Sequence, residues 1–202
     1  MPENATPPPP LPALTRILIG PPGKVLLPFV ALVALIILNN SSLPGGGSFQ
    51  LLLMGLGLAY GTIIVWVARF VVALFRSDGR SMLRRHWVRW AAAPVMAVAV
   101  IGPVYADLPF SARFALSESS LESLARTVAS GPASTDDADQ WVGLYPLTSI
   151  SRTEDGARFL VDGTGFLNQY GFAWSPKGPP AEESHTDYTH IQGPWYIWEM
   201  QW

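Results

Sequence analysis

Two histidines and an aspartate near the C-terminus are the residues best suited to chemistry. In the segment HTDYTH, His185, Asp187 and His190 offer two imidazoles and one carboxylate, which is a reasonable ligand set for zinc or another divalent ion. Their spacing matches no established metal motif. Residues five apart on a strand point to opposite faces, so only a loop would let both histidines converge. We interpret the segment as a polar loop and keep a metal site as the alternative.

Other catalytic chemistry has little support in the sequence. The acidic residues Asp136, Asp137 and Asp139 lack the spacing of a calcium-binding loop, and a solvated acidic loop explains them. The chain has no cysteine, which excludes a disulfide, a thiolate nucleophile and a zinc–sulfur site. There is also no G-x-S-x-G nucleophile elbow. We therefore expect no cofactor and no catalytic residue, and leave an enzyme open only as an alternative.

Long uncharged stretches indicate that much of the chain lies in a bilayer. Only 14% of the residues are charged, whereas a soluble domain has about 25%. Between Val25 and Phe75 the only charged side chain is Arg69, and between Trp90 and Ala106 there is none. These runs predict three membrane-spanning helices, over 25–38, 49–75 and 90–108. The first run also has the length of a signal-peptide core, but we favour an uncleaved anchor because no small-residue cleavage site follows it.

Arginine placement predicts how the chain crosses the membrane. Five arginines lie between the second and third runs, whereas the connection NNSSLPGGGS between the first two is uncharged. Before residue 100 there are eight basic and two acidic residues; from 101 onward there are five basic and 13 acidic ones. Basic loops stay in the cytoplasm, so we expect a cytoplasmic N-terminus and an extracytoplasmic C-terminal half. The arginines assigned to topology and to anionic lipid are Arg76, Arg80, Arg84, Arg85 and Arg89. The stretch is too short for nucleic-acid binding.

The predicted fold is a three-helix membrane protein with a small extracytoplasmic α+β domain that contains an antiparallel sheet. Residues 1–24 are Pro-rich and are expected to be a disordered cytoplasmic tail, 25–108 form the transmembrane region, and 109–202 form the outer domain. In that domain we expect a helix from Ser119, with Glu122 completing a capping box, ending at Gly131-Pro132. Four strands should follow, two of them in a hairpin that turns at Asp155-Gly156.

Large aromatic residues gather in the last 29 positions and are the candidate partner-binding residues: Trp174, Tyr196, Trp198 and Trp202. Strand alternation in WYIWEMQW places Tyr196, Trp198 and Trp202 on one face. They form either the core of a small sheet or a partly exposed aromatic surface for a protein partner, a glycan or a lipid headgroup. The sequence leaves both interpretations open.

The C-terminal segment, GFAWSPKGPP through YTHIQGPWYIWEMQW, resembles the ends of small uncharacterised integral membrane proteins of high-GC Gram-positive bacteria. The resemblance covers about 45 residues, implies an exported, membrane-anchored domain, and transfers no catalytic residue.

The sequence thus favours a multi-pass plasma-membrane protein whose aromatic-rich outer domain binds a protein partner or an envelope component. The expected contacts are the lipid bilayer, and a protein partner or a second copy of the chain through the membrane helices. Two alternatives stay open. One is a metal-binding or enzymatic outer domain that uses His185, Asp187 and His190, and the other is an accessory subunit of a membrane complex or transporter.

Overall fold

The computed structural model of the chain describes residues 26–131, 139–165, 168–181 and 183–201. The N-terminal tail expected over 1–24, two candidate calcium ligands (Asp136 and Asp137) and the candidate partner-binding Trp202 lie outside these residues. The described residues form two compact units. One consists of 26–33 and 57–98, and the other consists of 34–56 and 99–201.

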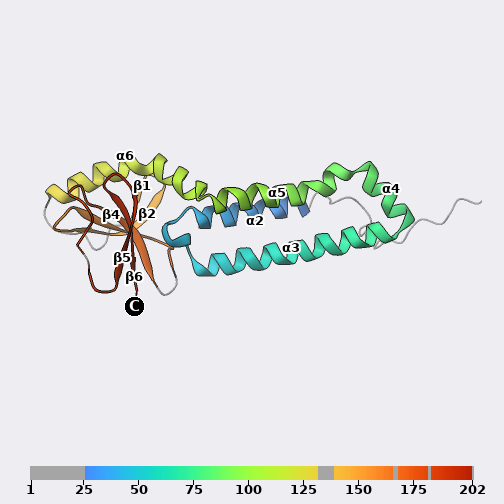
Figure 1. Cartoon of the computed structure of the whole chain (residues 1–202), viewed down its shortest axis with the longest axis horizontal. Coiled ribbons are helices and arrows are strands. Elements are labelled where there is room, and N and C mark those ends of the chain that lie inside the picture. The colour runs from blue at the N-terminus through green and yellow to red at the C-terminus, as the bar shows by residue number, and fades with distance from the viewer. Residues whose placement is uncertain (1–25, 132–138, 166–167, 182, 202) are drawn as a thin grey trace, which may run out of the picture. The chain divides into compact units, whose positions relative to one another are not determined.

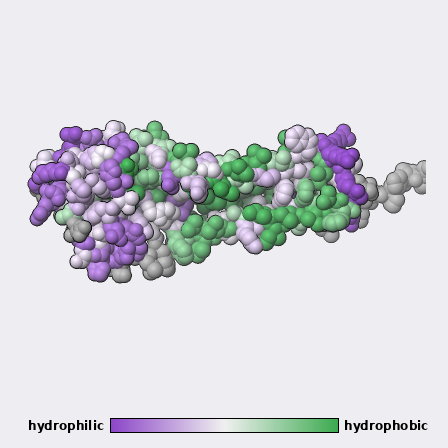
Figure 2. All heavy atoms as spheres, in the orientation of Figure 1, coloured by the Kyte–Doolittle hydropathy of each residue, from purple (hydrophilic) through white to green (hydrophobic). Residues whose placement is uncertain are grey.

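The helices follow the apolar runs of the sequence (Figure 1). Their bounds are α2 Leu26–Ser41, α3 Phe49–Phe75, α4 Ser77–Arg85, α5 Trp87–Tyr105 and α6 Leu108–Ser130. Within the described residues, two of them, α3 and α5, are long and apolar enough to cross a membrane. Both carry predominantly hydrophobic residues in Figure 2. The 16-residue α2 is shorter, and at 1.5 Å per residue it measures about 24 Å against a hydrocarbon core of about 30 Å.

The first unit is held together by an aromatic cluster between α3 and α5. The indole of Trp66 donates a hydrogen bond to the carbonyl oxygen of Trp90 at 3.2 Å. The ring of Phe70 stacks on Trp66 with the centroids 5.2 Å apart and meets Trp90 edge-on at 5.9 Å. Such pairs of aromatic rings add to the free energy gained from burial, so the cluster fixes α3 beside α5.

The arginine-rich connection was expected to be a loop, and it is a helix instead, α4. Any side chain at Gly79 would overlap the backbone of Ala73, so α4 packs tightly against the end of α3 at this glycine. All five topology arginines, 76, 80, 84, 85 and 89, are exposed. The hydrophilic atoms of α4 are visible in Figure 2.

The second unit contains an antiparallel sheet. In the described residues it has six strands in the order β1-β2-β3-β4-β6-β5. Their bounds are β1 Gln140–Val142, β2 Tyr145–Arg152, β3 Ala157–Val161, β4 Gln169–Trp174, β5 Thr186–Gln192 and β6 Trp195–Met200. The antiparallel sheet and the β2–β3 hairpin around Asp155-Gly156 are confirmed. The prediction of only four strands is wrong, because β1 and β5 were not foreseen.

Helix α6 covers one face of the sheet (Figure 1). Its side chains Phe114 and Leu121 join Phe159, Phe172 and Trp195 from three strands in one buried core. The expected start at Ser119 is wrong, since the helix already begins at Leu108. Pro109 occupies the first turn of this helix, where a missing N–H costs nothing. The proposed capping box therefore lies inside the helix.

The connection between α2 and α3 is part of the same unit as the sheet. A short 3₁₀ turn, η1 (Pro44–Gly46), occupies this connection. Gly45 has a φ of 67° and lies so close to the ring of Tyr170 that a side chain would overlap it. Ser48 pairs with Gly165 in an isolated bridge. The uncharged residues 39–48 thus pack against the sheet.

Candidate binding site

The candidate site lies on the face of the sheet opposite α6, which we call the open face. Residues directly opposed on neighbouring antiparallel strands share a face, and α6 contacts the face that carries Phe159 and Phe172. Arg158 alternates with these core positions on β3 and is opposed by Ser151 on β2 and by Ala173 on β4. The row continues through Tyr196 on β6. Arg158 is thus a charged residue near the middle of the open face.

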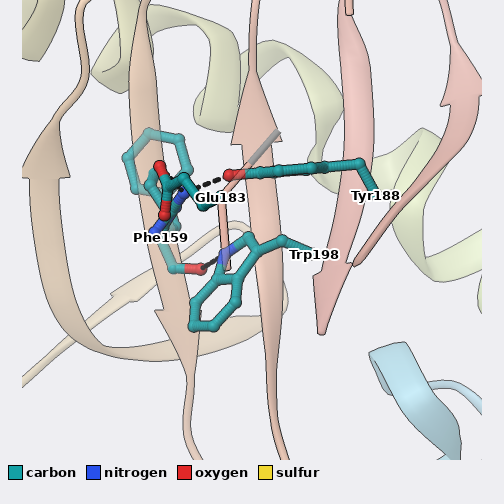
Figure 3. Close-up of polar contacts among 5 residues, drawn as sticks. Phe159, Glu183, Tyr188 and Trp198 are labelled. Carbon is teal, nitrogen blue, oxygen red and sulfur yellow. Dashed lines mark hydrogen bonds and ion pairs between the residues drawn. The ribbon is translucent and has the colours of Figure 1, made fainter. Parts of the chain in front are cut away.

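A tryptophan forms the floor next to this arginine. Trp198 is only 3% exposed, and its indole nitrogen donates a hydrogen bond to the backbone oxygen of Phe159 at 3.1 Å (Figure 3). To do so the ring crosses β4 over Gly171, where a Cβ atom would lie 2.7 Å from the indole nitrogen. Glycine at this position therefore makes room for the ring, which lies across three strands.

The guanidinium of Arg158 contacts two aromatic residues in different ways. Its central carbon is 5.3 Å from the ring centroid of Trp198 and 5.7 Å from that of Tyr188. The distance to Trp198 falls within cation–π range, whereas the guanidinium meets Tyr188 at its hydroxyl, which accepts a hydrogen bond from Nη2. The contact with Trp198 and the hydrogen bond to Tyr188 restrict the orientation of the planar guanidinium, so the donor groups of Arg158 are held in a defined direction.

Among the described residues, one nitrogen of Arg158 makes two polar side-chain contacts. Nη2 donates to the hydroxyl of Tyr188 and to Oε1 of Glu183, the latter at 2.7 Å (Figure 3). The arginine side chain is 14% exposed, whereas that of Glu183 is 48% exposed. Burial raises the pKa of the Tyr188 phenol above its usual value, and the positive charge of Arg158 opposes this effect. Tyr188 is therefore a neutral hydroxyl at physiological pH.

A pocket of about 420 Å³ opens beside this group. This size is within the range of small-molecule sites, about 300–1,000 Å³. The β2–β3 turn forms one side, and the segment between β4 and β5, which carries Glu183, forms another. Its charged lining residues are Arg152, Glu154, Asp155, Arg158 and Glu183. Both signs of charge are present, so the pocket suits a polar ligand more than an apolar one.

The structure does not bring the three candidate metal ligands together. His185 lies in the turn before β5 with a φ of 67°, while Asp187 and His190 lie on the strand itself. Asp187 is opposed by Glu199, and His190 is opposed by Tyr196, so the two point to opposite faces. Among the described residues, no group of three histidine, aspartate or glutamate side chains is arranged to hold a metal ion. The polar loop expected here is edge strand β5, and the metal site stays a sequence prediction without structural support.

The candidate partner-binding aromatics are largely buried. Trp174 is 8% exposed and belongs to the core under α6, where the guanidinium of Arg126 lies 5.9 Å from its ring. Tyr196 is 9% exposed and lies with Trp198 on the open face. The expected alternation of Trp195 and Tyr196 is thus present. Trp198 is buried next to the guanidinium of Arg158, and direct partner contact by these rings stays a prediction.

Sequence reasoning missed Arg158, Glu183 and Tyr188 as a group. They come from β3, the β4–β5 segment and β5, and only the strand order places them together. One signal was present in the sequence: an arginine flanked by Ala157 and Phe159 in a β-rich run must lie on the face opposite to these apolar residues. Comparison with protein-family models, with curated proteins and with solved structures found no match to the chain.

Proposed function

We propose that this chain is a multi-pass plasma-membrane protein that displays the sheet domain outside the cytoplasm, where the open face binds an envelope component or a protein partner. The observation that carries the binding function is the pocket beside Arg158. Arg158 is mostly buried, keeps one N–H donor without a partner among the described residues and lines a pocket of about 420 Å³, a combination that favours recognition of a polar ligand.

Two helices, α3 and α5, suit a membrane by length and composition, and we propose α2 as the third span. Helix α2 has no charged residue, and the residues that follow it, 39–48, belong to the same compact unit as the sheet. The end of α2, the start of α3 and the end of α5 all fall in that unit. This distribution is what three spans would give if residues 39–48 and the sheet lay on the same side of the membrane.

The arginines favour an outward-facing sheet domain. Five exposed arginines are carried on or next to α4, between α3 and α5, and basic connections of this length stay in the cytoplasm. The opposite ends of α3 and α5 belong to the unit with the sheet. With α4 inside, the N-terminus is cytoplasmic and the open face is extracytoplasmic.

Site-specific photo-crosslinking tests the binding function. A photoreactive amino acid replaces Ser151, which opposes Arg158 on the open face, and in a matched control it replaces the exposed Thr127 on α6. We expect a covalent adduct in intact cells from position 151 and not from 127. Equal adducts at the two positions, or none at 151, would contradict binding through the open face.

A further inference from the structure

Arg158 has hydrogen-bonding capacity that the protein does not use. Its Nε is buried and has no hydrogen-bond partner among the described residues, although the side chain is 14% exposed and lines the pocket. Leaving a buried charged donor without an acceptor costs about 1–3 kcal/mol or more, and such groups in folded proteins usually indicate a missing partner. The missing partner here must be a hydrogen-bond acceptor.

The existing partner, Glu183, holds the arginine weakly. It contacts the guanidinium through a single oxygen, Oε1, whereas a carboxylate that uses both oxygens forms a stronger, two-point contact. Glu183 is half-exposed and lies in the segment before β5, at the turn where the amide of Thr186 donates to its carbonyl oxygen at 3.2 Å. Its side chain can swing into solvent without unpairing a strand of the sheet.

We infer that the pocket beside Arg158 is a binding site for a ligand that carries a single carboxylate, which replaces Glu183 on the guanidinium. The inference rests on the proposed binding function of the open face and names the chemistry it recognises. Glu183 occupies the place of the ligand carboxylate when the site is empty. The guanidinium rests against Trp198 and is fixed by the hydroxyl of Tyr188, and departure of Glu183 would free Nη2 and open a path to the neighbouring Nε for the two oxygens of the ligand carboxylate.

The charges around the pocket explain why a monocarboxylate is favoured over phosphate. Three carboxylates, Glu154, Asp155 and Glu183, line the pocket together with two arginines. Arg152 is exposed and its guanidinium donates to the carbonyl oxygen of Gly131 at 2.9 Å, whereas Arg158 is mostly buried, so a charge on the ligand is screened less by water at Arg158. A doubly charged phosphate would be repelled by the acidic residues more strongly than a singly charged carboxylate.

Ligand-observed NMR on the full chain in detergent micelles tests the site, with N-acetylglycine and glucuronate as probes. These two represent a peptide terminus and an acidic sugar, and inorganic phosphate at matched ionic strength is the comparison. We expect at least one carboxylate to bind the wild-type chain more tightly than phosphate does. The carboxylate that binds identifies the source of the ligand. Loss of binding in Arg158→Lys is expected to be about tenfold, because lysine keeps the charge but cannot make the two-point contact.

Glu183→Gln makes the test specific, because it removes the competing carboxylate and keeps the shape of the side chain. The affinity for the carboxylate probe should rise several-fold in this variant, whereas Arg126→Gln, on the α6 side, should leave it unchanged. Near-ultraviolet circular dichroism checks that each variant is folded. The inference is overturned if neither probe binds wild type or Glu183→Gln, if phosphate binds as well as the carboxylates, or if Arg158→Lys binds as wild type does. In those cases a position-dependent adduct at residue 151 would still support binding by the open face.

Discussion

Arg113 on α6 and Ser42 in the α2–α3 connection are 71 positions apart in the chain, and the guanidinium of Arg113 donates a hydrogen bond to the Ser42 hydroxyl at 2.8 Å. The same guanidinium donates to the carbonyl oxygen of Leu144 through Nε at 3.0 Å and lies 4.8 Å from the ring centroid of Tyr145. One side chain thus joins the connection, the long helix and the first turn of the sheet.

A double-mutant cycle measures this link. Arg113→Ala should lower the free energy of unfolding of the sheet unit by about 2 kcal/mol, because it leaves the Leu144 carbonyl without its charged donor. Ser42→Ala should cost about 1 kcal/mol, and the double variant should lose less than the sum because the two residues are in contact. Tryptophan fluorescence during urea unfolding in mild detergent gives the values.

The exposed pair Arg126–Glu122, 2.6 Å apart on α6, serves as the control for this cycle. Glu122→Gln, which removes the ion pair and leaves Arg126 against Trp174, should change stability by less than about 0.5 kcal/mol. Strictly additive effects of Ser42→Ala and Arg113→Ala would show that the α2–α3 connection does not pack on the domain.

Tyr145 should make the unit sensitive to alkali. Burial raises the pKa of its phenol well above the usual value, and the charge of Arg113 only partly opposes this. Above about pH 10 the unfolded chain loses the phenolic proton while the folded chain keeps it, so stability is complete below that pH and falls above it, by up to about 1.4 kcal/mol per pH unit. Tyr145→Phe should unfold with a shallower pH dependence between pH 10 and 12. Identical slopes in the two proteins would contradict the burial of this hydroxyl.

Gly171→Ala should disrupt the floor of the site. The added methyl group would overlap the backbone oxygen of Phe159 and lie 2.7 Å from the indole nitrogen of Trp198. The backbone cannot yield cheaply, so a loss of about 1–3 kcal/mol is expected, together with a change in the tryptophan near-ultraviolet signal. Gly57→Ala, where a Cβ meets nothing within 4 Å, is the matched control. Unchanged stability and spectrum in Gly171→Ala would mean that the indole does not cross this strand.

Local patterns predicted the elements with strong signals. The turn at Asp155-Gly156 and the alternation of Trp195 and Tyr196 were readable because strand periodicity and turn chemistry act over a few residues. Strand β5 was missed because an edge strand that is partly exposed on both faces can be as polar as HTDYTH. The start of helix α6 is not evident from the sequence, because Pro109 suits both the end of a membrane span and the first turn of a new helix.

The site itself could not be predicted, because it depends on register. Arg158, Glu183 and Tyr188 meet only when β6 lies between β4 and β5, an order that no local pattern encodes. The sequence also gives no sign that residues 39–48 contact the sheet. A glycine-rich, uncharged connection is typical of a simple turn. It packs on Tyr170 only because Gly45 has no side chain that would overlap the tyrosine ring.

The side of the membrane on which the open face lies is tested most directly by cysteine labelling. The chain has no cysteine, so single cysteines can be placed at the exposed positions Lys177, beside the pocket segment, and Arg84, on α4. In intact cells, a membrane-impermeant maleimide should label Lys177→Cys, and it should label Arg84→Cys only after permeabilisation. Labelling of Arg84→Cys in intact cells with Lys177→Cys protected would reverse the orientation and contradict an open face that meets ligands outside the cytoplasm.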